Sequence, residues 1–332
     1  APFLYPEVLL PPVCASLSWC MLVAPPCTTH LLPSFIRPSV NLLLLFLLLC
    51  VCMRPAMAGV TRHASNGIVA KLQFLTSRDS NAAYVASVAG EAAATHDGQY
   101  TFHELFLADG RTHATTFSLD REGFQLLKQP PPIENFFDED KLKEVYEAEV
   151  RKLVQAHTGC RRVQIFDHTR RSASDALRRE LKTREPSSVV HNDYSEWSAT
   201  NRLRAILPEE ADELVKGRFA IVNVWRSISG SIESYPLAFC DSTSMDDARD
   251  LVAVKRKAAD RIGEVQLGLY NPTQRWFYFP RMSMEEAVLF KTFDSQTEDV
   301  NRFTLHAAFE DPSSDPDAPP RQSIETRCFI FF

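Results

Sequence analysis

Basic segments are missing from this chain of 332 residues, and glycine is scarce. The 36 Lys and Arg residues are outnumbered by 42 Asp and Glu residues, the formal net charge is −6, and the isoelectric point is near 5.9. Binding to a phosphate backbone requires a concentrated positive face, so we expect no nucleic-acid partner. With only 11 glycines, the chain has neither a Walker phosphate loop nor a GxGxxG fingerprint, which weighs against nucleotide-binding folds.

Charge is also scarce in residues 1–56, where only Glu7, Arg37 and Arg54 are charged, although this segment holds five of the eight cysteines. Its apolar run, residues 42–53, is shorter than the roughly 20 residues that span a bilayer, so we expect no stable membrane association. Either the segment lies upstream of a natural start at Met57, or it is a targeting signal cleaved near Ala56-Met57-Ala58. A membrane anchor is the third alternative. We predict that residues 1–56 are not part of the fold.

Cysteine is sparse after Met57, where Cys160, Cys240 and Cys328 are the three that remain. An odd, widely spaced set of cysteines builds neither a disulfide framework nor a four-cysteine zinc site. The set favours a reducing compartment, so we predict a cytoplasmic protein. Secretion is the alternative if residues 1–58 are a targeting segment.

Residues 57–332 have the composition of a globular protein, since 45% of the whole chain is hydrophobic and 23% is charged. We predict a single catalytic domain in three parts. Residues 57–135 are β-rich, with strands at 68–75, 100–107 and 115–119 and a hairpin turn at Asp109-Gly110. Residues 136–217 are helical, with one helix over 139–156 that ends before Gly159 and a second over 208–217.

The third part, residues 218–332, predicts a mainly β fold with flanking helices. Seven short strands in about 115 residues are typical of a sandwich, a barrel or a jelly roll. One helix is expected between them, over 245–261. The predicted strands are 219–228, 236–241, 264–270, 276–281, 287–293, 303–309 and 323–332.

Two histidines and one aspartate form the candidate metal site. His191 and Asp193 are two residues apart in a strand-like segment, so both side chains point to one side, and His306 lies in a later strand. Two imidazoles and one carboxylate on one face of a metal ion are the facial triad of non-haem Fe(II) oxygenases. A strand histidine is more often structural, but a further element follows the pair. Arg321 and Ser323 open the last strand, where a guanidinium fork and a hydroxyl could hold the remote carboxylate of 2-oxoglutarate.

Residues 133–332 resemble the fungal and bacterial secondary-metabolite hydroxylase/desaturase family, grouped with cephalosporin 7α-methoxylases and gibberellin desaturases. The resemblance implies a double-stranded β-helix, or jelly roll, that binds Fe(II) through His191, Asp193 and His306 and uses 2-oxoglutarate and O2 on a small-molecule substrate. It does not separate hydroxylation from desaturation, nor identify the substrate. The segments that carry it are residues 165–171, 190–194, 223–226, 236–238, 276–280 and 318–325.

Three further residues are candidates for the substrate pocket or for contacts around the metal. Tyr194 follows the ligand pair, Arg226 could meet an anionic group, and Arg327 is the nearest rival of Arg321 for the cosubstrate. We expect a structural hydrogen-bonding role for His168. Two other functions stay open at this point: a zinc-dependent jelly-roll hydrolase that uses the same three ligands, and a ligand-binding barrel without catalysis. The sequence does not specify an oligomeric state.

Overall fold

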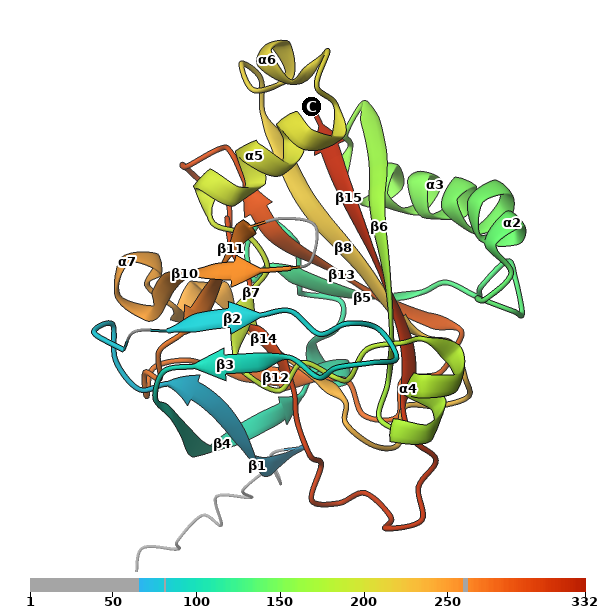
Figure 1. Ribbon diagram of the computed structural model, residues 1–332, viewed down its shortest axis with the longest axis vertical. Helices are drawn as coiled ribbons and strands as arrows, with labels where there is room; N and C mark the ends of the chain where they lie inside the picture. Colours follow the sequence, from blue (N-terminus) through green and yellow to red (C-terminus); the bar gives the residue numbers. More distant parts are fainter. Residues whose placement is uncertain (1–65, 81, 259–261) are drawn as a thin grey trace, which may run out of the picture. The chain divides into compact units, whose positions relative to one another are not determined.

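The computed structural model describes residues 66–80, 82–258 and 262–332 (Figure 1). Residues 1–56 and the predicted boundary at Met57 lie outside these ranges, so both stay predictions. None of the described helices combines the length and the apolar character that crossing a bilayer requires.

The described strands form two β-sheets. The larger is a mixed sheet whose strands run, in spatial order, β1 (Gly67–Leu75), β4 (Tyr100–Asp109), β12 (Trp276–Tyr278), β9 (Leu237–Cys240), β14 (His306–Ala308), β7 (His191–Asn192), β11 (Ile262–Gly268), β10 (Leu251–Lys257), β2 (Ala83–Val85) and β3 (Thr95–Asp97). The smaller is antiparallel, in the order β5 (Phe124–Lys128), β13 (Glu286–Asp294), β8 (Phe219–Ser227), β15 (Gln322–Phe331) and β6 (Arg162–Ser172).

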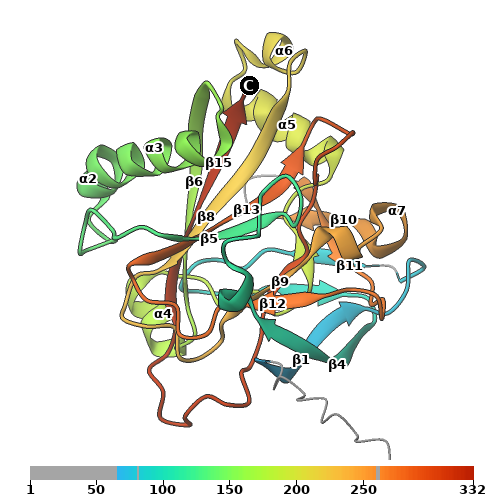
Figure 2. The ribbon, with the colours of Figure 1, turned by 180° about the vertical axis from the view of Figure 1, so that it is seen from behind.

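The two sheets face each other across a shared core. Phe219 and Ile221 of β8 and Phe329 of β15 belong to the same buried cluster as Ala238 of β9 and Leu305, which precedes β14. Because side chains alternate along a strand, every second residue of β8 and β15 points into this interior. The architecture is the predicted jelly roll, seen from both sides in Figures 1 and 2.

The outer face of the smaller sheet is covered by a helical layer. α2 (Glu139–Lys141), a π-helical turn (Leu142–Tyr146) and α3 (Glu147–Thr158) run without a break (Figure 1). Leu153 and Val154 of α3 pack on the sheet. Gly159 ends α3 in the left-handed region, with φ 67°, and its N–H donates to Gln155 O. The helix predicted over 139–156 is confirmed.

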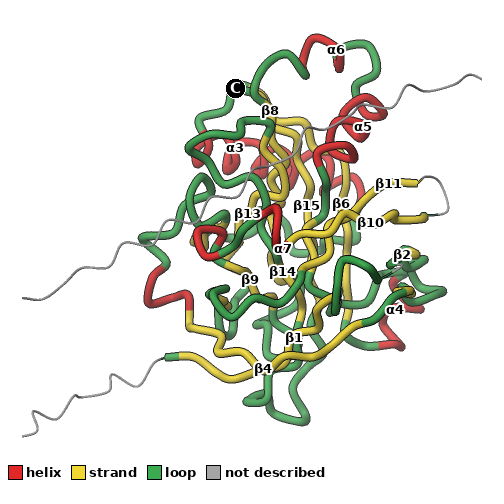
Figure 3. Tube along the Cα trace, turned by 90° about the vertical axis from the view of Figure 1, so that its left-hand side faces the viewer, coloured by secondary structure: helices red, strands yellow, loops and turns green. Residues whose placement is uncertain are grey.

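The described residues also form four shorter α-helices: α4 (Asp175–Leu181), α5 (Glu196–Ile206), α6 (Ala211–Leu214) and α7 (Asp247–Asp250). Ala199 and Leu203, one turn apart on α5, are fully buried in the core between the sheets. Ser195 caps α5 with a reciprocal Ser195–Ser198 capping box. Figure 3 shows α5 and α6 near the carboxyl end of the chain.

Several sequence-based expectations are corrected. Asp109-Gly110 is not a hairpin turn: β4 pairs with β1 and β12, Gly110 opens a 3-10 turn (Gly110–His113), and 115–119 is not a strand. The helix expected over 245–261 is confined to α7, because β10 follows and pairs with β11 along its full length. The second predicted helix shrinks to α6.

The seven strands predicted after residue 218 are all present, with ends that differ by a few residues. Several elements were not predicted as such: β2, β3, β5, β6, β10, α4 and α5. β6 carries alternating charged residues that resemble an exposed loop in the sequence, and α5 contains polar residues that conceal its short apolar stripe.

Candidate active site

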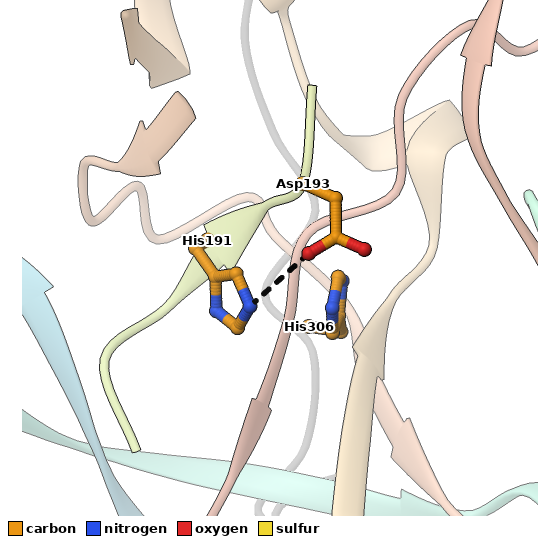
Figure 4. A group of neighbouring side chains, drawn as sticks. All are labelled: His191, Asp193 and His306. Atoms are coloured by element: carbon orange, nitrogen blue, oxygen red, sulfur yellow. Dashed lines mark ion pairs between the residues drawn. The ribbon is translucent and has the colours of Figure 1, made fainter. Parts of the chain in front are cut away.

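The three candidate metal ligands come together where β7 and β14 pair. His191 and His306 are directly opposite each other in this antiparallel pair, and Asp193 follows β7 by one residue. One ligand atom from each residue lies within 4.8 Å of the other two, as expected from the sequence (Figure 4). His306 is buried and the side chains of His191 and Asp193 are each 12% exposed, so an ion bound here would be largely shielded from water.

Each histidine ring is oriented by a hydrogen bond from its Nδ1 to the backbone carbonyl two residues earlier. Nδ1 of His191 lies 2.8 Å from Val189 O, and Nδ1 of His306 lies 2.9 Å from Thr304 O. A carbonyl oxygen only accepts, so each Nδ1 carries the proton and donates. This tautomer leaves both Nε2 lone pairs available to a metal ion, and the backbone partner fixes each ring.

Asp193 is held through one carboxylate oxygen. Its Oδ2 accepts hydrogen bonds from Asn223 Nδ2 at 2.8 Å and from Arg327 Nε at 3.0 Å, while Oδ1 lies 3.7 Å from His191 Nε2 (Figure 4). Asn223 is on β8 and Arg327 on β15, where the two residues are paired across the smaller sheet. The smaller sheet therefore orients the carboxylate toward the histidines on the larger one.

The protonation states suit metal binding. Burial, reinforced by the neighbouring His306, lowers the pKa of His191 to about 3, and burial lowers the pKa of His306. Burial alone would raise the pKa of the Asp193 carboxyl, but Arg327 and the two histidines outweigh it and lower that pKa. Two neutral imidazoles and one carboxylate are the deprotonated set that a divalent cation requires.

A buried asparagine ties the ligand strands together. The Nδ2 of Asn192 donates to Gln266 Oε1 at 2.7 Å and to Thr292 O at 3.0 Å, and its Oδ1 accepts from Thr304 N at 3.2 Å. These bonds connect β7 to β11, to β13 and to the segment that leads into His306. Gly268 of β11 lets this strand lie close to Val190, the residue before β7, because a Cβ at position 268 would be 2.5 Å from Val190 Cγ1.

A cavity of about 220 Å³ opens next to the metal-ligand group. His191, Asp193 and Arg327 line it, together with residues of α5, β10 and β11 and the segment after α4. Its position beside the candidate ligands makes it the natural binding space for a small molecule.

Arg321 and Ser323, the predicted cosubstrate residues, lie at the start of β15, facing the interior between the sheets. Arg321 is 2% exposed and Ser323 is 1% exposed. Arg321 donates from Nη1 to Tyr235 O at 2.6 Å and stacks on the Trp225 ring at 5.4 Å. Its Nε and the Ser323 hydroxyl have no hydrogen-bond partner among the described residues. Neither residue is among those that line the cavity.

This corner fits the remote carboxylate of 2-oxoglutarate. Burial, with a smaller contribution from Arg171, lowers the pKa of the Arg321 guanidinium below its usual range, and no carboxylate in the described ranges forms an ion pair with it. A buried cation and a buried hydroxyl without partners are costly unless a ligand supplies the missing acceptors. A carboxylate would satisfy both.

Arg327, the predicted rival of Arg321, is fully committed to protein carboxylates. Besides Asp193 it pairs with Asp167 at 2.5 Å and with Glu325. Burial would lower its pKa, but these acids raise it well above the usual range. Arg327 therefore contacts a metal-ligand candidate rather than offering a free fork to a cosubstrate.

Tyr194 and Arg226 have different positions. Tyr194 lines the cavity, and burial raises the pKa of its phenol to about 12, so the ring stays neutral. Arg226 points to the other face of β8, where it donates to Gln129 O and lies over the Tyr146 ring at 5.9 Å. The structure corrects the suggestion that Arg226 meets an anionic substrate group, because alternation along β8 directs it away from the interior.

His168 has the structural role that was expected. It lies on the outer face of β6, with Nδ1 2.9 Å from Thr326 Oγ1 and Nε2 3.2 Å from Glu147 Oε1. Two partners in the site were not predicted: Asn223, which contacts Asp193, and Asp167, which pairs with Arg327. The available signal was their place in two of the segments that carry the family resemblance.

This chain is similar in sequence and in fold to known proteins. Residues 72–331 match the family described as Oxidoreductase/YMDC permease-like domain. The hydroxylase/desaturase CTB9 of Cercospora beticola is 32% identical over 255 residues, which cover 70% of this chain and 78% of that protein. The Fe(II)/2-oxoglutarate-dependent dioxygenase nvfI of Aspergillus novofumigatus is 29% identical over 240 residues, covering 70% and 84%. A solved structure of the iron and alpha-ketoglutarate-dependent endoperoxidase NvfI matches with a TM-score of 0.69 and 25% identity, covering 80% of this chain and 98% of that one.

The jelly roll, the His191–Asp193–His306 group and these relatives define the class, an Fe(II)- and 2-oxoglutarate-dependent oxidoreductase. The chain belongs to the Oxidoreductase/YMDC permease-like family. The proteins most relevant to its activity, CTB9 and nvfI, are named a hydroxylase/desaturase and a dioxygenase. The predicted family, fold class and oxygenase activity are confirmed. The comparisons favour this function over a zinc hydrolase or an inactive binding barrel.

Proposed function

We propose that this protein hydroxylates or desaturates a small molecule in a secondary-metabolite pathway, with His191, Asp193 and His306 as the Fe(II) ligands. The observation that carries the proposal is the convergence of these three side chains at one buried point, with both Nε2 atoms and one carboxylate oxygen unconstrained by other partners. Three protein ligands on one face leave positions for a cosubstrate and for oxygen.

Arg321 and Ser323 hold the remote carboxylate of 2-oxoglutarate in this proposal. The support is their burial without partners at the interior start of β15. A guanidinium fork and a hydroxyl supply charge-assisted hydrogen bonds in a dry site, where they are strongest. Fe(II), 2-oxoglutarate and O2, once held at this site, would together supply the oxidant that removes hydrogen from a substrate C–H bond.

The other residues of the chain position and shield this chemistry. Arg327 and Asn223 fix the Asp193 carboxylate, and Val189 and Thr304 fix the histidine tautomers. The two sheets exclude bulk water from the ligand group, so that the oxidant meets a positioned substrate rather than solvent.

Succinate release tests the proposal. Purified protein supplied with Fe(II), ascorbate and 2-oxoglutarate in air should produce succinate, and anaerobic protein should bind one Fe(II) per chain. The variants His191→Ala, Asp193→Ala and His306→Ala should lose both properties. Succinate production that survives in any two of them would show that the metal is held elsewhere.

We also propose that the chain from Met57 onward forms the folded domain and acts in the cytoplasm, without nucleic acid or a stable membrane association. The support is the change in composition and charge at that point of the sequence. A chain that starts at Met57 should bind Mn(II) as tightly as the full chain and melt at the same temperature. Aggregation of the shorter chain alone would make residues 1–56 part of the fold.

A further inference from the structure

One wall of the cavity carries adjacent positive charges. Arg171 on β6 and Arg184, in the segment after α4, both line it. Their backbones are neighbours: Arg184 N donates to Arg170 O at 3.0 Å, Ser172 N donates to Arg184 O at 2.8 Å, and the two arginines form a parallel bridge. Partners in such a bridge direct their side chains to the same side, so the two guanidinium groups face the cavity together.

Among the described residues, neither cation has a carboxylate of its own: Asp167, which acts to raise the pKa of Arg184, is already paired with Arg327. Arg171 donates from Nη1 to the backbone oxygen of Glu185 at 2.8 Å. Across residues 66–80, 82–258 and 262–332, neither Arg171 nor Arg184 forms an ion pair with a carboxylate, in contrast to Arg327, which has three. Burial and the neighbouring arginines, Arg171 first, lower the pKa of Arg184. Half-buried like charges side by side are unfavourable unless an anion lies between them.

The acids that line the cavity are engaged elsewhere. Asp193 belongs to the metal-ligand group and accepts from Arg327 and Asn223. Glu264 accepts a hydrogen bond from Ser195 Oγ at 2.5 Å, at the start of α5. The positive wall is therefore not neutralised by the acids of its own cavity.

Apolar side chains line the cavity as well. Trp197 of α5 is 54% exposed and Ile262 of β11 is 65% exposed, although both are large and apolar. Val265 and Leu267 continue this apolar surface toward the pairing of β11 with His191. Large apolar groups left uncovered around a cavity mark the binding surface of an apolar ligand.

We propose that the primary substrate is an apolar molecule with a carboxylate, which Arg171 and Arg184 hold while the apolar body lies against Trp197 and Ile262. This proposal rests on the proposed function, because it places the substrate beside the candidate iron ligands. The carboxylate anchors one end of the substrate, so the carbon that reacts is set by its distance from that end.

The carboxylate of 2-oxoglutarate is the other possible source of the same chemistry, and the experiment separates the two. Protein loaded with Fe(II) and 2-oxoglutarate under argon is titrated calorimetrically with 4-phenylbutyrate and 8-phenyloctanoate, and with the amide of each acid. The affinity for 2-oxoglutarate is measured separately. The variants are Arg184→Gln, Arg184→Lys and, as a matched control, Arg179→Gln, since Arg179 is exposed on the neighbouring α4 and does not line the cavity.

The wild type should bind at least one acid roughly tenfold or more tightly than its amide, the value of one charge-assisted hydrogen bond. Arg184→Gln should abolish this preference and leave the dissociation constant of 2-oxoglutarate unchanged. Arg184→Lys should retain part of the preference, because it keeps the charge but not the fork. Arg179→Gln should match the wild type.

Equal binding of acid and amide by the wild type, or binding of neither, overturns the proposal. So does a result in which Arg184→Gln weakens 2-oxoglutarate and leaves the preference intact, because the arginines would then serve the cosubstrate. Failure of the wild type to bind 2-oxoglutarate at all would instead contradict the proposed function, and the acid-to-amide ratio would still decide whether the cavity selects anions.

Discussion

Arg321, just before β15, and Arg327, within β15, both face the interior between the sheets, but their partners differ. Arg327 is surrounded by Asp193, Asp167 and Glu325, whereas Arg321, six residues earlier, has a backbone carbonyl, an aromatic ring and no carboxylate among the described residues. The first is part of a completed network that orients a metal ligand. The second is incomplete without a ligand. A buried charge with its partners built in is structural, and one without them marks where a ligand of opposite charge binds.

Loss of a metal ligand should have the largest effect, because it removes the centre that the Arg327 network serves. Asp193→Ala or His306→Ala should abolish Mn(II) binding, succinate release and the rise in melting temperature that metal gives the wild type. For the wild type, metal at about 100 times its dissociation constant should add about 2.7 kcal/mol to the free energy of unfolding. Calorimetry with and without Mn(II) measures this. A metal-induced shift that persists in both variants would contradict the ligand assignment.

Removal of Arg327 tests whether its pairing with three carboxylates stabilises the fold and orients Asp193. Arg327→Met leaves three carboxylates without their cation, so the metal-free protein should lose about 3–5 kcal/mol of unfolding free energy. The affinity for Mn(II) should also fall roughly 10- to 100-fold, because Asp193 is no longer oriented. Denaturant titration and metal titration check the two effects.

Arg170→Met is the matched control for Arg327→Met. Arg170 is on the outer face of β6, where it donates to Phe136 O at 2.7 Å and pairs with Glu139. Its loss should leave the affinity for Mn(II) unchanged. Equal losses of metal affinity in both variants would mean that Arg327 acts only through general stability.

Removal of Arg321 tests whether this arginine, which has no carboxylate partner among the described residues, binds 2-oxoglutarate. Arg321→Ala should weaken 2-oxoglutarate binding roughly 10- to 100-fold, since charge-assisted hydrogen bonds contribute about 1.5–3 kcal/mol. Arg321→Lys should fall between Arg321→Ala and the wild type, because it keeps the charge without the fork. Anaerobic titration of the Fe(II)-loaded protein measures this. If Arg327→Met loses 2-oxoglutarate affinity and Arg321→Ala does not, the cosubstrate assignment is wrong.

The smallest effect should be on the stability of the ligand-free protein without Arg321. Arg321→Met replaces an uncompensated buried cation with an apolar side chain of similar length, so the free energy of unfolding should stay within about 1 kcal/mol of the wild type or rise. Denaturant titration without metal or 2-oxoglutarate tests this. A loss as large as that of Arg327→Met would remove the contrast between the two arginines.

Local patterns were sufficient for the strands that build the second half of the domain. Runs rich in β-branched and aromatic residues identified β8, β13 and β15 from the chain alone, because strands buried on both faces are apolar on both. The same rule failed for β10 and β6. In β10 the decisive interaction is pairing with β11, and in β6 charged residues form ion pairs with a neighbouring strand, such as Asp167 with Arg327 of β15.

The candidate metal ligands were determined by the sequence itself: His-x-Asp places two donors on one side of a strand, and a third histidine in a later strand completes the set. The different situations of Arg321 and Arg327 were decided only by the tertiary structure. Both face the interior by alternation, so no local pattern separates them. Which of the two meets three carboxylates depends on where β6 and β7 bring Asp167 and Asp193, and those positions exist only once the sheets have assembled.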